Sequence, residues 1–396
     1  MALVDKIGKF SFRAANAGLL VAANALAERM LPSDQFGRVY IMLSLTSILI
    51  GTFDYYNQKY LIFIYSNSGI GRNLSILLVV KLLLIFEVLF ILLFLGLEFQ
   101  GILVGNLLLY VCIGIFVVFS ILSQSLSTYI FCTERARHLL YCNIASAIFM
   151  VMYFIYIFST NSIDILFLVV GLIVFRGIEF LYYLIYLGFG RERLLFLPKW
   201  AEIYKFIKSN SRGAYYIQWL LSLVSSRISA ILLPLYLVYE EIAIYGKFSI
   251  LVSLMYFWIS FSGSTFFSEV CKRGVSHNLL KKTFIEIMIY IFVFWIIELV
   301  AIVYLYHDLV EYSFLIAAII FLISFTSYQG YFLFYYGLDR LIVRMSLFTI
   351  LLSYPVYIIL INYYGLYGAF SANIIIESIG FIMALIAVLK KRRKQV

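Results

Sequence analysis

The residues of this sequence that could do chemistry are ionisable side chains within long apolar runs. Arg176 and Glu179 stand three residues apart in GLIVFRGIEF, and Arg227 stands in LSLVSSRISAILLP. Ionised side chains at membrane depth carry a high free-energy cost, so they face water or the interior of a helix bundle and are candidates for function. An arginine in such a place can hold an anionic group through charge-assisted hydrogen bonds.

The two arginines differ in the partners that their own helices offer. Arg176 can form an ion pair with Glu179 one turn away, which would only stabilise its helix, or it can face a cavity; both interpretations are open. Arg227 has no acidic residue within one turn, and the serines of its run lie on the opposite face of a helical wheel. We therefore expect Arg227 to face a cavity rather than a buried salt bridge.

Further polar residues interrupt other apolar runs. Asn16 and Asn24 share a stripe with Arg13 and Glu28, within about 120° at 100° per residue, which predicts that the first helix lines a wet cavity. Lys81 lies about nine ångström inside its run and can snorkel back to the interface, although it is also a candidate for substrate binding. Isolated carboxylates can pair with an arginine or take up a coupling proton, and the sequence does not separate these roles. The ion-coupling candidates are Glu87, Glu179, Glu298 and Glu377.

The composition places these residues in a membrane protein. Hydrophobic residues make up 64% of the 396 positions, charged residues only 13%, and the mean hydropathy is +1.02. A spanning helix needs about 20 apolar residues, so the apolar total fills about twelve spans. A soluble enzyme, a nucleic-acid-binding domain and a disordered scaffold are excluded, because none of them could bury so much apolar surface. Barrel strands are excluded as well, since the runs are continuously apolar rather than alternating.

Apolar runs bounded by charge, Gly or Pro predict where the spans lie. The predicted spans are 12–29, 37–56, 75–96, 103–129, 139–159, 164–187, 213–237, 244–267, 284–306, 312–335, 345–362 and 367–389. With the N-terminus inside, only Arg29, Arg38 and Lys247 of the 30 Lys and Arg residues fall in outward segments. This asymmetry predicts that both termini are cytoplasmic.

The chain is expected to consist of two lobes of six spans. The predicted domains are 1–190, the linker 191–212 and 213–396, which ends in a basic tail. Hydrophobic residues at helical spacing among the lysines of the linker predict a helix on the membrane surface. The expected fold is therefore an all-α polytopic membrane protein with two six-helix lobes around a central cavity.

Two sequence echoes relate the lobes. FGRVYIMLSL begins at Phe36 shortly after a Leu-Pro, and YGKFSILVSL begins at Tyr245 after another. A weaker echo pairs ERARHLLYCNIASAI from Glu134 with DRLIVRMSLFTIL from Asp339. Both copies begin on the same side of the membrane, so the echoes predict a parallel duplication. Transporters place substrate at the interface of such repeats.

The motifs of catalysis are missing from the sequence. It has no GxxxxGK[ST] loop for ATP phosphates and no HExxH, and its three histidines are expected in loops. The cysteines lack a paired spacing for zinc. All outward loops are estimated at under about ten residues, too short for a large outer domain. We therefore predict a transporter with no catalytic residues, no metal and no cofactor.

The chain resembles the Wzx-type O-antigen or polysaccharide-unit flippases of the multidrug/oligosaccharidyl-lipid/polysaccharide exporter superfamily. The resemblance rests on LPSDQFGRVYIMLSL (Leu31 to Leu45), on the six-plus-six arrangement and on GLYGAFSANII (Gly365 to Ile375). It implies two lobes around a cationic cavity, to which Arg176 and Arg227 each contribute one cation. It also implies that the protein moves an undecaprenyl-diphosphate-linked oligosaccharide to the periplasmic leaflet of the bacterial inner membrane, a step of lipopolysaccharide biosynthesis.

The sequence leaves the energy source and the alternative functions open. Energy would come from an H⁺ or Na⁺ gradient or from the membrane potential. The partners implied are the lipid-linked oligosaccharide and, in the same membrane, a polysaccharide polymerase and a chain-length regulator, with no nucleic acid. The alternative is a cation-coupled exporter of small amphipathic drugs in the same fold, with a more apolar cavity. A membrane glycosyl- or acyltransferase is disfavoured by the short outer loops and the absent histidine motif.

The charge asymmetry predicts a topology that reporter fusions can test. Fusions after residues 160, 240, 308 and 364 should report the periplasm, and fusions after 135, 200, 275 and 340 the cytoplasm. A consistent inversion between two neighbouring fusion points would show that one span was miscounted.

Overall fold

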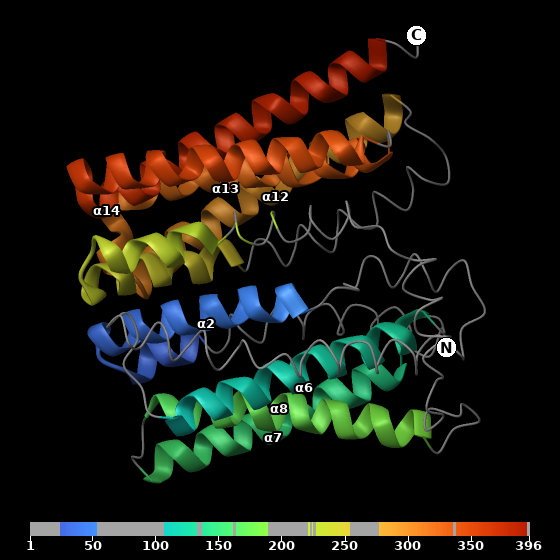
Figure 1. Cartoon of the computed structure of the whole chain (residues 1–396), viewed down its shortest axis with the longest axis vertical. Coiled ribbons are helices and arrows are strands. Elements are labelled where there is room, and N and C mark those ends of the chain that lie inside the picture. The colour runs from blue at the N-terminus through green and yellow to red at the C-terminus, as the bar shows by residue number, and fades with distance from the viewer. Residues whose placement is uncertain are drawn as a thin grey trace. The chain divides into compact units, whose positions relative to one another are not determined.

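The computed structural model describes residues 24–53, 107–132, 137–160, 164–188, 221, 224, 227–253, 277–335 and 338–393 (Figure 1). Apart from short turns, these residues form α- and 3-10 helices. Helices satisfy their own backbone hydrogen bonds, which is the requirement for crossing a bilayer. Three predicted site residues, Asn16, Lys81 and Glu87, lie outside the described residues, as does the predicted linker 191–212.

The chain divides into two compact units. Unit 1 comprises Met1–Leu31 and Met42–Tyr216, and unit 2 comprises Pro32–Ile41 and Ile217–Val396. Helix α2 (Ser33–Phe53) thus contributes its first turns to unit 2 and the rest to unit 1. The sequence-based domain boundaries stay a prediction.

Three long helices form the described core of unit 1. They are α6 (Leu107–Cys132), α7 (Arg137–Thr160) and α8 (Ile165–Gly188), and α8 packs against both of the others (Figure 1). These bounds differ by at most four residues from the predicted spans. The agreement follows from the bilayer, because its thickness fixes the length of each apolar run.

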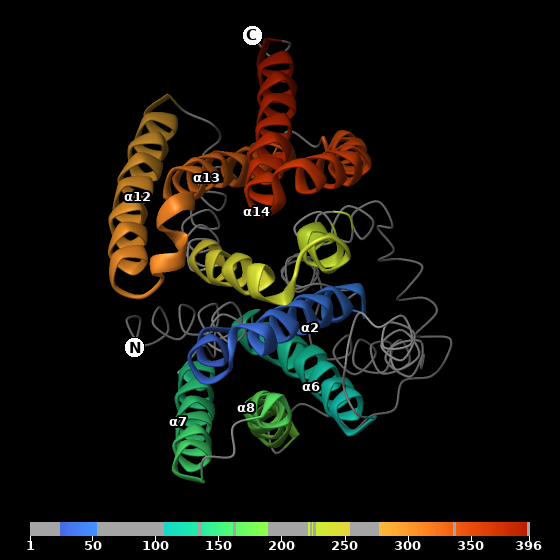
Figure 2. The same cartoon turned by 90° about the vertical axis from the view of Figure 1, so that its left-hand side faces the viewer.

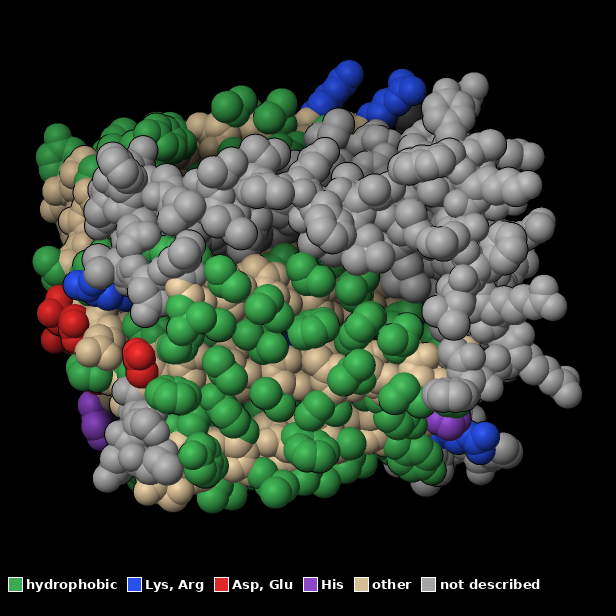
Figure 3. All heavy atoms as spheres, turned by 60° about the horizontal axis from the view of Figure 1, so that its bottom comes forward, with side chains coloured by type: hydrophobic (Ala, Val, Ile, Leu, Met, Phe, Trp, Pro, Cys, Tyr) green, Lys and Arg blue, Asp and Glu red, His purple; other side chains and the backbone are tan. Residues whose placement is uncertain are grey.

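The surface of the described helices is suited to lipid. Figure 3 shows a face whose middle is covered by hydrophobic side chains, with charged side chains toward its ends. On α7, Met152, Ile155 and Tyr156 are each at least 60% exposed. Six described segments are long and apolar enough to cross a membrane. The chain is therefore a membrane protein, as predicted.

The described part of unit 2 contains three long helical elements and shorter pieces. Its elements are residues 227–232, η1 (Leu233–Leu235), residues 239–253, α12 (His277–Tyr304), η2 (His307–Tyr312), α13 (Ser313–Tyr335) and α14 (Asp339–Arg393). α13 packs along α14. Figure 2 shows that α14 consists of two helical halves in different directions.

Two glycines explain the sharp bend in α14. Gly365 has a φ of 56°, a left-handed conformation that glycine adopts without strain. A Cβ at Gly368 would overlap the carbonyl oxygen of Leu360 on the first half. The two halves therefore fold back closely only with glycine at these positions. The break lies between the predicted spans 345–362 and 367–389.

Within unit 2 the two copies of the first sequence echo contact each other. A Cβ at Gly246 would come 3.0 Å from the Phe36 ring, and a Cβ at Gly37 would overlap the carbonyl oxygen of Tyr239. The rings of Tyr40 and Tyr245 meet edge to face with centroids 6.1 Å apart. The glycine of each echo thus lets the start of α2 and residues 239–253 approach closely.

The close approach at Gly368 predicts the stability of two matched variants on α14. Gly368→Ala should destabilise the protein by about 1–3 kcal/mol, because the new methyl group overlaps a backbone carbonyl that cannot move freely. Gly380→Ala is the control: its Cβ would lie 4.0 Å from the Thr326 side chain, so alanine should stabilise the helix by about 0.5–1 kcal/mol. Thermal unfolding in detergent measures both variants. Equal midpoints would contradict the close packing.

Candidate functional site

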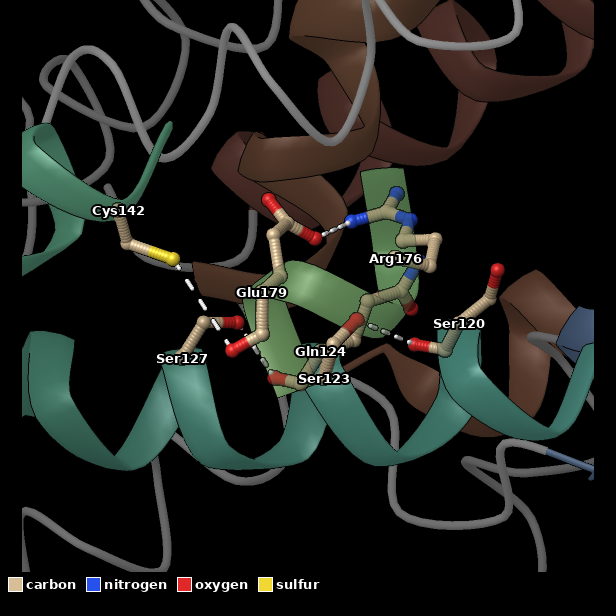
Figure 4. Close-up of polar contacts among 7 residues, drawn as sticks. All are labelled: Ser120, Ser123, Gln124, Ser127, Cys142, Arg176 and Glu179. Carbon is tan, nitrogen blue, oxygen red and sulfur yellow. Dashed lines mark hydrogen bonds and ion pairs between the residues drawn. The ribbon is translucent and has the colours of Figure 1, made fainter. Parts of the chain in front are cut away.

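An ion pair lies in the middle of α8. Nη1 of Arg176 is 2.6 Å from Oε2 of Glu179, and the two side chains are only 4% and 3% exposed (Figure 4). The spacing of three residues places both side chains on one face of the helix, which is the geometry of an i,i+3 pair. The structure therefore contains the ion pair that the sequence left as one of two alternatives. The role of Arg176 in substrate binding stays a prediction.

Neutral groups from the described helices α6, α7 and α8 lie around this pair. On α6, Ser123 lies close to the Glu179 side chain, and its hydroxyl donates to the backbone oxygen of Ser120, 3.3 Å away. On α7, Sγ of the buried Cys142 lies 4.0 Å from the backbone oxygen of Glu179 and contacts the Tyr183 side chain. Figure 4 shows how α6 and α7 present these groups toward α8. Among the described residues, Arg176 is the positive charge that faces Glu179.

The polar contacts continue along α7 and α8 to the start of α7. His138 stacks on the ring of Tyr186, with centroids 3.9 Å apart, and its Nδ1 lies 3.3 Å from the hydroxyl of Tyr182. The expectation that the histidines lie in loops is wrong for His138, which belongs to the first turn of α7. His277 likewise begins α12, and His307 begins η2. The helices begin several residues before the apolar runs do, so the polar residues next to these runs are also helical.

Sequence reasoning overlooked His138, Cys142 and Tyr183 as members of this cluster. A signal was present, because His138 and Cys142 are four residues apart, as are Glu179 and Tyr183. Residues four apart share a helix face. The sequence does not say, however, which faces of the two helices meet.

Arg227 lies in unit 2 at the start of the helical residues 227–232 and is partly buried. Within the described part of the chain, its guanidinium makes no hydrogen bond or ion pair. Asn24, another predicted substrate-binding residue, is partly buried in the helical residues 24–30. Whether Arg176 and Arg227 face one cavity, as predicted, is not tested and stays a prediction.

Two predicted ion-coupling residues lie in unit 2 with different surroundings. Glu298 is 3% exposed, and neither carboxylate oxygen has a hydrogen-bond partner among the described residues. It shares a face of α12 with the buried Ile291 and Ile302. Glu377, in the second half of α14, is partly buried and lies close to Thr326 of α13, whose hydroxyl donates to the backbone oxygen of Leu322. Both carboxylates therefore lie within helices that are otherwise apolar.

A second polar cluster in unit 2 was not predicted. The Tyr357 hydroxyl donates a hydrogen bond to Oδ1 of Asn373, and Nδ2 of Asn373 donates to the hydroxyl of Tyr245. These bonds join both halves of α14 to residues 239–253. Tyrosines at such depth usually find a partner, but nothing in the sequence identifies Asn373 as that partner.

The fold has counterparts among solved structures. A multidrug resistance transporter of the MATE family and MOP superfamily, inward-facing, aligns over 100% of both chains with 13% identity and a TM-score of 0.65. The lipid II flippase MurJ, in an inward closed conformation, aligns over 98% of this chain and 89% of its own with 14% identity and a TM-score of 0.70. No protein-family model matches the sequence, and no curated protein is similar to it in sequence.

The chain has the fold of MOP-superfamily transporters. At these identities the likeness establishes the fold alone, and it confirms the predicted class of an all-α polytopic membrane protein. The two neighbours are described as a transporter and a flippase, not as enzymes.

The buried ion pair predicts how single and double variants differ in stability. Arg176→Met alone should destabilise the protein by about 3–5 kcal/mol, because it leaves the Glu179 carboxylate buried without its cation. The double variant Arg176→Met/Glu179→Leu should recover most of that loss, since no uncompensated charge remains. Thermal unfolding of the three proteins in the same detergent measures the coupling. Additive effects would contradict the pairing.

Proposed function

We propose that this protein is a flippase of the Wzx type within the MOP superfamily. Its substrate would be an undecaprenyl-diphosphate-linked oligosaccharide, such as an O-antigen repeat unit, moved from the cytoplasmic to the periplasmic leaflet of the bacterial inner membrane. The observation that carries the proposal is Arg227, a partly exposed cation in an apolar run with no described ionic partner. A lipid-linked diphosphate is too polar to cross unaided, and a cation at that depth stabilises its head group.

The neighbours support movement of such a substrate. MurJ, which shares the fold at a TM-score of 0.70, is described as a lipid II flippase. Alternating access of the substrate site to the two sides of the membrane would carry the head group across. Asn16, Asn24 and Lys81 complete the proposed substrate-binding set together with Arg176. A polysaccharide polymerase and a chain-length regulator are the proposed partners in the membrane.

The alternative is a cation-coupled exporter of small drugs. The MATE neighbours favour it, because they are described as multidrug resistance transporters. The two functions differ in the charge of the substrate, since a lone intramembrane arginine attracts an anion and repels a cationic drug. Accumulation of lipid-linked oligosaccharide in the inner leaflet of a deletion strain would support the flippase. Loss of drug resistance without that accumulation would support the exporter.

The role of Arg227 is tested by two substitutions. Arg227→Ala should abolish surface polysaccharide while leaving the inserted protein at its normal level, because the cation contacts substrate rather than a buried acid. Arg227→Lys should keep part of the activity, since it retains the charge but loses the guanidinium fork. Arg176→Ala should instead lower the protein level, because it leaves the Glu179 carboxylate buried without its cation, and export per inserted protein should fall less than in Arg227→Ala, because Glu179 already neutralises Arg176.

The amount of inserted protein distinguishes an Arg227 that contacts substrate from an Arg227 that belongs to a buried ion pair. Removal of one partner of a buried ion pair would destabilise the fold and lower the level. Normal export by a stably expressed Arg227→Ala protein at native copy number would remove the main reason for choosing an anionic substrate.

The carboxylates in unit 2 are the proposed couplers to an H⁺ or Na⁺ gradient. Glu298→Gln and Glu377→Gln keep the side-chain volume but cannot gain or lose a proton. We expect both proteins to fold, and at least one of them to lose the dependence of transport on the ion gradient. The measurement is transport with and without an uncoupler. Unchanged transport and an unchanged uncoupler response in both variants would make these residues structural, and the role of coupler would pass to Glu87 or Glu179.

A further inference from the structure

We propose that the Arg176–Glu179 pair is an anion site that opens only when Glu179 takes up a proton. A diphosphate group would take the guanidinium of Arg176 from Glu179, and Glu179 would bind one proton in the same event. This inference rests on the proposed function, because it assigns to Arg176 the diphosphate of a lipid-linked substrate. It answers whether the pair is only structural or also takes part in binding.

The Arg176–Glu179 pair is deeply buried. At 2.6 Å and with both side chains almost fully covered, each charge is compensated by the other. A buried pair of this kind contributes little net stability, whereas an uncompensated charge in the same place is strongly unfavourable. Arg176 therefore cannot turn to another anion while Glu179 keeps its negative charge and its position.

The described neighbours of Glu179 include no second cation. Its own helix presents Arg176 and Tyr183, α6 presents Ser123, and α7 presents Cys142. None of these groups except Arg176 carries a positive charge, so no described neighbour can replace the guanidinium. A neutral carboxylic acid needs no such partner, and the Ser123 hydroxyl can hydrogen-bond to either form.

Proton uptake is the consequence. When the diphosphate binds Arg176, a proton from the solvent adds to a carboxylate oxygen of Glu179 and forms an O–H bond, so Glu179 no longer adds its own negative charge beside that of the diphosphate. The long side chain of arginine can reorient while its backbone stays helical. Because binding and protonation are linked, each must favour the other by the same factor.

The test uses the purified full-length protein and farnesyl diphosphate as a short lipid diphosphate. Calorimetry in two buffers of different ionisation enthalpy gives the protons bound per ligand, at alkaline pH where the probe is fully ionised. We expect the wild type to take up one proton and to lose affinity by about tenfold per pH unit, as one linked proton requires. Farnesol, which lacks the diphosphate, should cause no uptake.

Two variants assign the proton to Glu179. Glu179→Gln should bind farnesyl diphosphate with no linked proton and no pH dependence over this range. Ser127→Ala is the matched control, because the Ser127 hydroxyl donates to the backbone oxygen of Gln124 on its own helix, and it should behave like the wild type. Equal proton uptake by Glu179→Gln and the wild type would overturn the proposal while leaving the flippase function intact.

The wild type alone decides the matter if Glu179→Gln does not fold. Infrared difference spectra should gain the C=O stretching band of a protonated carboxylic acid when farnesyl diphosphate is added. Diphosphate binding without that band and without proton uptake would overturn the proposal. Failure of the wild type to bind the diphosphate at any pH would overturn the flippase function, and the proton-linked site with it.

Discussion

The absence of water around the membrane-spanning helices is the constraint on which the structure depends. A backbone N–H or C=O in hydrocarbon has no solvent partner, so each described span satisfies these groups within its own helix. The same constraint acts on side chains. Many serine and threonine hydroxyls of these helices donate to a carbonyl one turn earlier, as Ser125 does to Ile121 and Ser324 to Ile320. Many polar side chains of these helices thus find a partner within their own helix.

Ionised groups meet the constraint in three different ways. Arg176 and Glu179 neutralise each other within unit 1. Glu298 is buried with no hydrogen-bond partner among the described residues. Arg227 has no described ionic partner and keeps part of its side chain exposed. These differences motivate the separate roles that we propose for them: a proton-linked anion site, a coupling group and a substrate cation.

Close contacts between helices depend on the same physics. Apolar surfaces gain little by meeting each other in lipid, so association depends on tight packing and on small residues that allow it. Gly368 permits the two halves of α14 to fold back on each other, and Gly37 and Gly246 permit the two echo segments to cross. The glycines of the GLYG motif (Gly365 and Gly368) are therefore accounted for by the bend and the close packing of α14.

The sequence by itself determined that the protein is helical and membrane-spanning, and where the described spans lie. α8 (Ile165–Gly188) and α13 (Ser313–Tyr335) begin and end within one residue of the predicted 164–187 and 312–335. The reason is that bilayer thickness sets the length of an apolar run, and both quantities can be read from one chain. The sequence also offered the Arg176–Glu179 ion pair as one of two alternatives, because two residues one turn apart on a helix can be paired from their spacing alone.

Only the tertiary structure decided which groups from different helices meet. Ser123 and Cys142 come to Glu179 from α6 and α7, and Asn373 hydrogen-bonds to Tyr245, which lies 128 positions earlier in the sequence. Helix periodicity assigns a residue to a face, but the partner of that face depends on packing. In an apolar run almost every face could be buried, so hydrophobic periodicity carries little information there. Contacts between polar groups on separate helices therefore had to come from the folded chain.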